Sequence, residues 1–244
     1  MVMQGFYKQD LAHVHDIGYG DHARKAAAEI CKILANNNIL DRLIVELGCG
    51  SGISALEFAR RGYKILGIDI SSAMVDLARA RVPQAEFYKA SLFKIDLPPC
   101  AVVTAIGECL NYLFDPDNQD DRLQQLFERI YQALMPGGLF IFDVAEPGLL
   151  EKGDEQHFTE GHDWLVLVEK EENLEQSTLT RRIITLRKIG EQYRRDDEVH
   201  HIRLYRSTDL AHKLRQAGFK IQSMRSYGDY QLPRAHAAFV ARKP

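Results

Sequence analysis

The sequence is poor in cysteine and has no long apolar run. Its four cysteines are widely separated, and none has the close spacing of zinc ligands: Cys31, Cys49, Cys100 and Cys109. No apolar stretch approaches the roughly 18–20 residues that cross a bilayer, and the first ten residues lack a basic segment followed by an apolar core. We therefore expect a cytoplasmic protein with reduced thiols, no metal site and no membrane partner.

Neither sign of charge is in large excess. The 31 Lys and Arg residues and 34 Asp and Glu residues give a net charge of −3. This balance lacks the global basic field that favours nucleic acid, so no nucleic-acid partner is expected. With 45% apolar and 27% charged residues among 244, the composition excludes a disordered or low-complexity protein. We expect one domain over 1–244; nothing in the pattern predicts an oligomeric state.

Between residues 20 and 145, helical patterns alternate with short apolar runs. Helical spacing of apolar residues occurs in four segments: 21–34, 54–61, 72–81 and 118–134. Strand-like runs occur in five segments: 43–47, 63–68, 85–88, 101–106 and 139–144. Such alternation is typical of an α/β domain whose parallel sheet is covered by helices on both faces.

The pattern changes after residue 150. Three β-rich runs with interleaved charges predict antiparallel strands, at 164–168, 178–189 and 199–205. We interpret 150–205 as a β-rich insertion over the active site, and its arginine pairs at 181–182 and 194–195 as solvent-exposed. A helix over 207–217 and strands at 219–226 and 236–241 then complete the main sheet.

A glycine-rich turn carries the chemical information. Gly48, Gly50 and Gly52 alternate directly after the first apolar strand and before a helix. Glycines let the backbone turn sharply and approach a ligand, although a glycine turn alone is also common without one. Asp69, nineteen positions after Gly50, ends the second strand, where a carboxylate can accept hydrogen bonds from ribose hydroxyls. Together these residues indicate a site for an adenosine-containing cofactor.

The glycine spacing resembles that of class I S-adenosylmethionine-dependent methyltransferases. A dinucleotide loop has Gly-x-Gly-x-x-Gly, whereas here Ile53 takes the place of the third glycine. Further segments resemble the family's loops and its connection to strand five: 89–92, 96–98, 105–108 and 134–138. The resemblance covers nearly the whole chain. It implies a Rossmann-like sheet of order 3-2-1-4-5-7-6 with strand seven antiparallel, S-adenosylmethionine as cofactor and S-adenosylhomocysteine as product.

More narrowly, the chain resembles glycine N-methyltransferase and the amino-sugar dimethyltransferases. In such enzymes an N-terminal segment, here 1–40, folds over the cofactor, so Arg24 is a candidate for the cofactor carboxylate. The alternative for Arg24 is a solvated helix surface. The other cofactor contacts implied by the resemblance are Glu46, Gly48, Cys49, Gly50, Gly52, Asp69, Ile70, Ser91, Leu92, Gly107 and Glu108.

Candidates for the acceptor end come from three places. Residues 13–20 are polar, aromatic and glycine-flexible; they predict either a lid or an ordinary N-terminal loop before the first helix. The catalytic candidates are His15, Asp16 and Tyr112, with Tyr7 as a further possible lid residue. The substrate-binding candidates are Tyr19, Asn111, His201 and Arg203, the last two on a polar strip that is equally consistent with a solvent-facing strand.

The sequence thus predicts methyl transfer to the nitrogen or oxygen of a small molecule. Three alternatives stay open: a cofactor-binding protein without catalysis, a methyltransferase acting on protein or RNA, and a nicotinamide-dependent oxidoreductase. The glycine spacing counts against the last of these.

Overall fold

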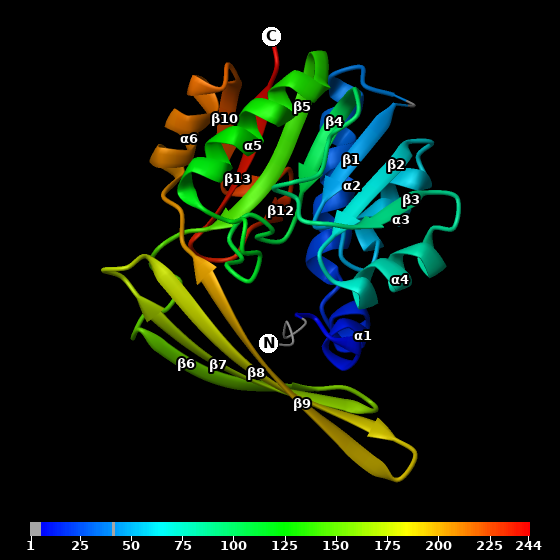
Figure 1. Cartoon of the computed structure of the whole chain (residues 1–244), viewed down its shortest axis with the longest axis vertical. Coiled ribbons are helices and arrows are strands. Elements are labelled where there is room, and N and C mark those ends of the chain that lie inside the picture. The colour runs from blue at the N-terminus through cyan, green and yellow to red at the C-terminus, as the bar shows by residue number, and fades with distance from the viewer. Residues whose placement is uncertain (1–5, 41) are drawn as a thin grey trace.

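The computed structural model describes residues 6–40 and 42–244, whose main sheet has seven strands in the order β3-β2-β1-β4-β5-β13-β10 (Figure 1). Their bounds are β1 (Leu43–Leu47), β2 (Lys64–Asp69), β3 (Glu86–Lys89), β4 (Cys100–Ala105), β5 (Leu134–Ala145), β10 (Lys220–Met224) and β13 (His236–Arg242). β13 runs antiparallel to both of its neighbours, and the pairs among β1 to β5 are parallel. The predicted fold class, strand order and antiparallel seventh strand are confirmed.

Helices cover both faces of this sheet. They are α2 (Asp21–Asn36), α3 (Ile53–Ala59), α4 (Ser72–Arg81), α5 (Asp120–Ala133) and α6 (Ser207–Gln216). Apolar residues of α2, α3 and α4 form one buried cluster with the sheet, and those of α5 and α6 form a second on the other face. The central strands β1, β4, β5 and β13 are largely buried on both sides, which explains their continuous apolar runs. A small hairpin, β11 (Ser226–Tyr227) and β12 (Tyr230–Gln231), packs near α2.

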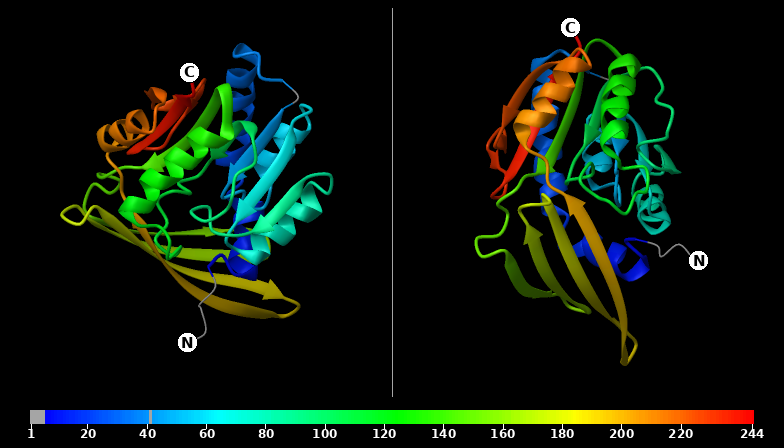
Figure 2. Two further views of the ribbon diagram at one scale, coloured as in Figure 1. Left: turned by 45° about the horizontal axis from the view of Figure 1, so that its top comes forward. Right: turned by 60° about the vertical axis from the view of Figure 1, so that its left-hand side comes forward.

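The insertion forms a separate antiparallel sheet of consecutive strands. These are β6 (Asp154–Glu160), β7 (Trp164–Asn173), β8 (Thr178–Ile189) and β9 (Gln192–Arg203). β6 was not predicted from the sequence, because this edge strand is largely exposed and has no apolar run. The predicted strands at 164–168 and 199–205 were shorter than β7 and β9. Figure 2 shows this sheet lying across from the carboxyl ends of the main parallel strands, with α1 between the two sheets.

Helix α1 (Gln9–Gly18) corrects the expectation of a flexible loop before the first helix. Leu11 and Val14 are buried in a cluster with Trp164, Val166 and Ile183 of the insertion. The helix is therefore stabilised by residues about 150 positions away, as is common for short helices that depend on tertiary packing. Local composition could not reveal this contact.

Candidate active site

A cavity of about 160 Å³ lies at the carboxyl ends of β1, β2 and β4, bounded on the other side by α1 and the start of α2. Ligands of open α/β sheets bind at this edge. The predicted residues that line it are Tyr7, His15, Tyr19, Gly48, Cys49, Gly50, Asp69, Ile70, Leu92, Gly107 and Tyr112. Lining residues that the sequence did not single out include His22, Cys109, Phe114 and Asp115.

The glycine loop and Asp69 form one unit. The Gly50 N–H donates to Asp69 Oδ2 at 2.9 Å, and the Ser71 N–H donates to Oδ1 at 2.8 Å. Burial raises the pKa of Asp69, although these two donors oppose the rise. Gly50 has φ +52°, and a Cβ added there meets no atom within 4 Å and would occupy the space beside the loop. The loop therefore presents bare backbone to a ligand.

Two residues of the predicted cofactor set lie beneath the loop and do not line the cavity. Glu46 is buried, its Oε1 accepts a hydrogen bond from the Ser54 hydroxyl, and burial raises its pKa to about 8. Glu46 is thus a neutral acid near pH 7 that ties β1 to α3. Gly52 lies against α4, where an added Cβ would come 3.0 Å from the Ala78 Cα. Both support the loop from behind.

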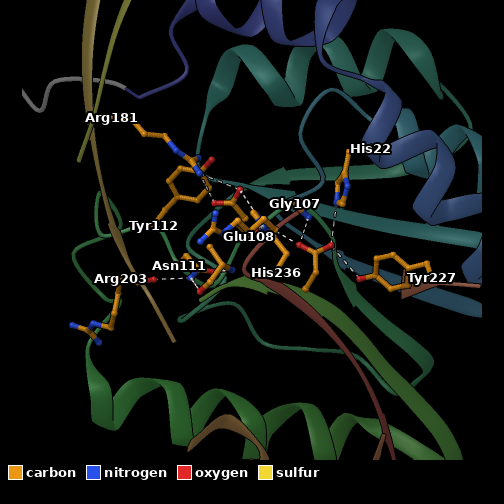
Figure 3. A network of polar contacts seen from close by, with 12 residues as sticks. His22, Gly107, Glu108, Asn111, Tyr112, Arg181, Arg203, Tyr227 and His236 are labelled. Carbon is orange, nitrogen blue, oxygen red and sulfur yellow. Dashed lines mark hydrogen bonds and ion pairs between the residues drawn. The ribbon is translucent and has the colours of Figure 1, made fainter. Parts of the chain in front are cut away.

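Asp143 on β5 organises the loop after β4 (Figure 3). Its buried carboxylate accepts the N–H groups of Gly107 and Glu108 at 2.9 and 2.8 Å. It also lies 3.1 Å from both the Tyr227 hydroxyl and His22 Nε2. A carboxylate that already accepts two N–H groups is an acceptor, so His22 carries its proton on Nε2. The sequence shows no sign of this network because its members come from four separate segments: β5, the loop after β4, β11 and α2.

Glu108 belongs to a buried ionic cluster. Arg181 Nη2 donates to both of its carboxylate oxygens, at 2.9 and 3.2 Å, and His236 Nε2 lies 3.1 Å from Oε1 (Figure 3). Burial alone would raise the pKa of Glu108, but the charge of Arg181 and the contact with His236 outweigh it and lower the pKa to about 2. Arg181, expected at the surface, is only 17% exposed. Glu108 therefore joins the insertion to the core and does not line the cavity.

Asn111 also joins these parts of the fold. Its Nδ2 donates to the Ala145 and Arg203 carbonyl oxygens at 3.0 and 2.6 Å, and its Oδ1 accepts the Ala145 N–H at 3.3 Å. The side chain is fully buried and its hydrogen-bonding groups are engaged by backbone. The structure thus places Asn111 between β5 and β9, away from the cavity.

Aromatic rings form the wall opposite the glycine loop. The Tyr7 and Tyr112 hydroxyls lie 2.9 Å apart, and Phe114 packs on Tyr112 with ring centroids 4.7 Å apart. The His15 ring lies 5.4 Å from that of Tyr7 and 6.2 Å from that of Tyr19. Burial lowers the pKa of His15 to about 4 and raises that of Tyr112 to about 12. Both groups are therefore neutral near pH 7, and only His15 is then able to accept a proton.

Three predicted residues near the cavity have their polar groups engaged elsewhere. Asp16 forms a two-pronged pair with Arg81 of α4, at 2.7 and 3.0 Å. Arg24 is exposed and pairs with Asp21 one turn earlier on α2. The Ser91 hydroxyl donates to Asp115 at 2.7 Å. The structure does not bring these three side chains into the cavity lining.

The polar strip predicted on β9 also lies outside the cavity. His201 is exposed, and its Nδ1 lies 3.2 Å from the Thr180 hydroxyl. Arg203 is half-buried at the end of the strand and does not line the cavity. Successive strand residues face opposite sides, and the inward side belongs to His200, which is fully buried.

Neither a metal-binding cluster nor a membrane-spanning helix is found in residues 6–40 and 42–244. No group of three or more His, Cys, Asp or Glu side chains in these ranges is arranged to hold a metal ion. Within the same ranges, no helix has the length and apolar character needed to span a membrane.

The chain was compared with known proteins. A family model described as a methyltransferase domain matches residues 44–138. Trans-aconitate 2-methyltransferase from Paracidovorax citrulli is 33% identical over 107 residues, which are 42% of this chain and 38% of that protein. The chain thus matches only 41% and 38% of the lengths of the first two curated relatives.

Solved structures match over much more of the chain. An S-adenosylmethionine-dependent methyltransferase from Clostridium acetobutylicum superposes with a TM-score of 0.81 at 19% identity, covering 95% of this chain and 96% of that one. The sugar N-methyltransferase KedS8 from Streptoalloteichus gives 0.79 at 17% identity, covering 99% and 96%. The resemblance predicted from the sequence is thus confirmed: residues 44–138 match the methyltransferase-domain model, and the chain has the fold of the S-adenosylmethionine-dependent methyltransferases.

Proposed function

We propose that this protein transfers a methyl group from S-adenosylmethionine to a nitrogen or oxygen atom of a small molecule. The observation that carries the proposal is that the Gly50–Asp69 unit and the aromatic wall of Tyr7 and Tyr112 line the same cavity. One side is suited to an adenosine-containing cofactor and the other to an acceptor. Methyl transfer requires these two ligands to meet in line.

The residues on the cofactor side fit S-adenosylmethionine. Asp69 borders the cavity and has acceptor capacity for ribose hydroxyls beyond its two backbone donors. Gly50 leaves space where a side chain would obstruct a ligand. When bound, the cofactor supplies a methyl group already activated on a sulfonium. The protein therefore has to hold the acceptor atom at about 3 Å and exclude water.

The acceptor side supplies hydrogen-bonding groups without a net charge. Tyr7, Tyr112 and His15 are neutral near pH 7 and border the cavity. We propose that His15 takes the acceptor's proton where one must leave, since it borders the cavity and its Nδ1 has no hydrogen-bond partner among the described residues. Tyr19 at the cavity rim and the tyrosine hydroxyls would orient the acceptor.

Three observations favour a small acceptor in the cytoplasm. Residues of α1 border the acceptor side of the cavity, and α1 packs against β8 of the insertion, which limits the space for an acceptor. Trans-aconitate 2-methyltransferase and the sugar N-methyltransferase KedS8 are named for small acceptors. All four cysteines are free thiols, which fits a reducing compartment.

The test is transfer of label from methyl-labelled S-adenosylmethionine to a cell extract, separated afterwards into small-molecule, protein and RNA fractions. We expect label in the small-molecule fraction. Label in protein or RNA would overturn the acceptor class while keeping the reaction. Binding of S-adenosylhomocysteine without labelling of any fraction would favour a binding protein without catalysis, and binding of a nicotinamide cofactor instead would favour an oxidoreductase.

A further inference from the structure

Glu198 lies one layer behind the aromatic wall. It sits on the inward face of β9, is 6% exposed and does not line the cavity. Its Oε2 accepts the Tyr7 N–H and its Oε1 accepts the Lys8 N–H, both at 2.8 Å. A carboxylate that receives two consecutive backbone N–H groups fixes the position and direction of that backbone. Glu198 therefore holds the segment of residues 6–8, called here the N-terminal strap.

The strap is held from the opposite side as well. The Ser71 hydroxyl, at the start of α4, donates to the Tyr7 carbonyl oxygen at 2.8 Å. Tyr7 has φ +47°, a left-handed conformation that is unfavourable for a residue with a Cβ. A residue keeps such a conformation when its surroundings fix it. Here the insertion fixes the N–H side and the core fixes the carbonyl side.

The held backbone directs the Tyr7 ring into the cavity. Its hydroxyl meets that of Tyr112 at 2.9 Å, and both side chains line the cavity. His200 supports this arrangement from behind: its Nε2 lies 2.8 Å from Glu198 Oε2 and its ring lies 5.0 Å from that of Tyr7. Because a carboxylate accepts, His200 carries its proton on Nε2. Glu198 thus links the strap to a fully buried side chain of the insertion.

We propose that Glu198 is a positioning residue for methyl transfer: it holds Tyr7 so that the Tyr7–Tyr112 hydroxyl pair meets the acceptor. This inference rests on the proposed function of the cavity. Without Glu198, water would solvate the strap N–H groups and Tyr7 would leave its left-handed conformation. The hydroxyl pair would then separate, while the Gly50–Asp69 unit, which is held by the N–H groups of Gly50 and Ser71, would keep its geometry.

The experiment compares Glu198→Gln and Tyr7→Phe with Asp197→Asn, an exposed carboxylate on the outward side of the same strand. Glutamine keeps the volume of Glu198, but its amide nitrogen does not accept an N–H, so at least one strap bond is lost. Four quantities are measured: amide hydrogen exchange at residues 7 and 8, the dissociation constant of S-adenosylhomocysteine, and the maximal rate and the KM for S-adenosylmethionine of label transfer to the extract.

In Glu198→Gln we expect amide exchange at residues 7 and 8 to rise, and transfer to slow, by about tenfold each, as loss of a charge-assisted hydrogen bond implies. The S-adenosylhomocysteine dissociation constant and the KM for S-adenosylmethionine should each stay within about threefold. Tyr7→Phe should slow transfer without faster exchange. The double variant should be no slower than Tyr7→Phe alone, since both act on one hydroxyl pair. Asp197→Asn should match the wild type.

The outcomes separate this inference from the proposed function. If the wild-type protein fails to bind S-adenosylhomocysteine, the proposed function fails first. If it binds, but exchange at residues 7 and 8 is unchanged in Glu198→Gln, Glu198 does not hold the strap and the inference is overturned; this result needs no acceptor. Equal losses of cofactor affinity and transfer rate would also overturn it, because Glu198 would then support the cofactor site as a whole.

Discussion

The two walls of the cavity are built in different ways. The cofactor wall joins residues near in sequence: Gly50 and Asp69 are 19 positions apart, at the ends of adjacent parallel strands. The acceptor wall joins distant ones: Tyr7 and Tyr112 are separated by 105 positions, and Tyr7 and Glu198 by 191. The first wall follows from one strand–turn–helix unit and its neighbouring strand, whereas the second exists only when the N-terminus, core and insertion have packed together.

The proposed cofactor and acceptor sites therefore depend on different parts of the fold. The glycine loop depends on β1, β2 and α4, which lie within the main sheet and its helices. The acceptor wall depends on α1, the strap and β9. Helix α1 packs on the insertion, β9 binds the strap, and they join the core through the Asp16–Arg81 pair and through backbone hydrogen bonds of His201 and Arg203. Changes in the insertion should therefore alter the acceptor wall and leave the cofactor wall intact. The following predictions test that separation.

The largest effect is expected at the cofactor wall. Gly50→Ala should abolish measurable binding of S-adenosylhomocysteine, because its Cβ enters the space beside the loop. Gly190→Ala is the matched control: Gly190 also has positive φ, with no atom within 4 Å of an added Cβ, but lies in the β8–β9 turn. Both should lose about 1 kcal/mol of stability from backbone strain. Calorimetric titration with S-adenosylhomocysteine distinguishes the two variants. Equal affinities of Gly50→Ala and Gly190→Ala for this ligand would show that the glycine loop does not face the cofactor.

The main sheet could be predicted because its signals are local. Apolar runs, helical spacing and the glycine turn each lie within a short segment, and the resemblance supplied the strand order. Gly50 and Asp69 were found in the same way, because a turn and a strand end fix their positions. The same local signal placed Glu46 and Gly52 correctly at the glycine loop. It could not show that both residues lie behind the loop and not on the side of the cavity.

The acceptor wall could not be predicted in the same way, because its signals are not local. Asn111 appeared as a polar residue at the active edge, but its amide is engaged by the Ala145 and Arg203 backbone. Arg181 appeared as a surface charge until the fold placed Glu108 beside it. The face of β9 that points inward depends on where the insertion docks, and alternation alone leaves both choices open.

The next largest effect is expected where the two parts meet. Glu108→Gln leaves the Arg181 charge buried without its partner and should cost about 3–5 kcal/mol in the free energy of unfolding. Glu169→Gln is the matched control, because it breaks an exposed pair with neighbouring Arg182 and should cost less than about 1 kcal/mol. Denaturant titration measures both. Equal costs would mean that the buried pair does not hold the insertion to the core.

The same pair sets a dependence on acid. The pKa of Glu108 is lowered from 4.5 to about 2 in the folded protein, so the unfolded chain takes up this proton first as the pH falls. The stability that Glu108 contributes is fully present above pH 4.5 and is lost toward pH 2. Glu108→Gln should therefore be less sensitive to pH in that window than the wild type.

A smaller effect is expected at Asp69. Asp69→Asn should weaken S-adenosylhomocysteine binding by about 1–3 kcal/mol, since it replaces a charged hydrogen-bond acceptor for ribose. Asp76→Asn, on the exposed surface of α4, is the control and should bind as the wild type does. Gly50 and Ser71 also donate to this carboxylate, so the substitution can destabilise the loop itself. The unfolding free energy of Asp69→Asn is therefore measured together with its affinity. Unchanged affinity would remove Asp69 from the site.

The smallest effect is expected on the outward side of β9. His201→Ala should change the unfolding free energy by less than about 0.5 kcal/mol and leave transfer unchanged, because the side chain is exposed and lies outside the cavity. His200→Ala, one residue away, removes a fully buried ring and should be clearly destabilising. Slower transfer in His201→Ala at unchanged stability would mean that the outward strip does contact the acceptor. The acceptor would then reach beyond the cavity to the outer face of the insertion, and the acceptor site would include residues of that face.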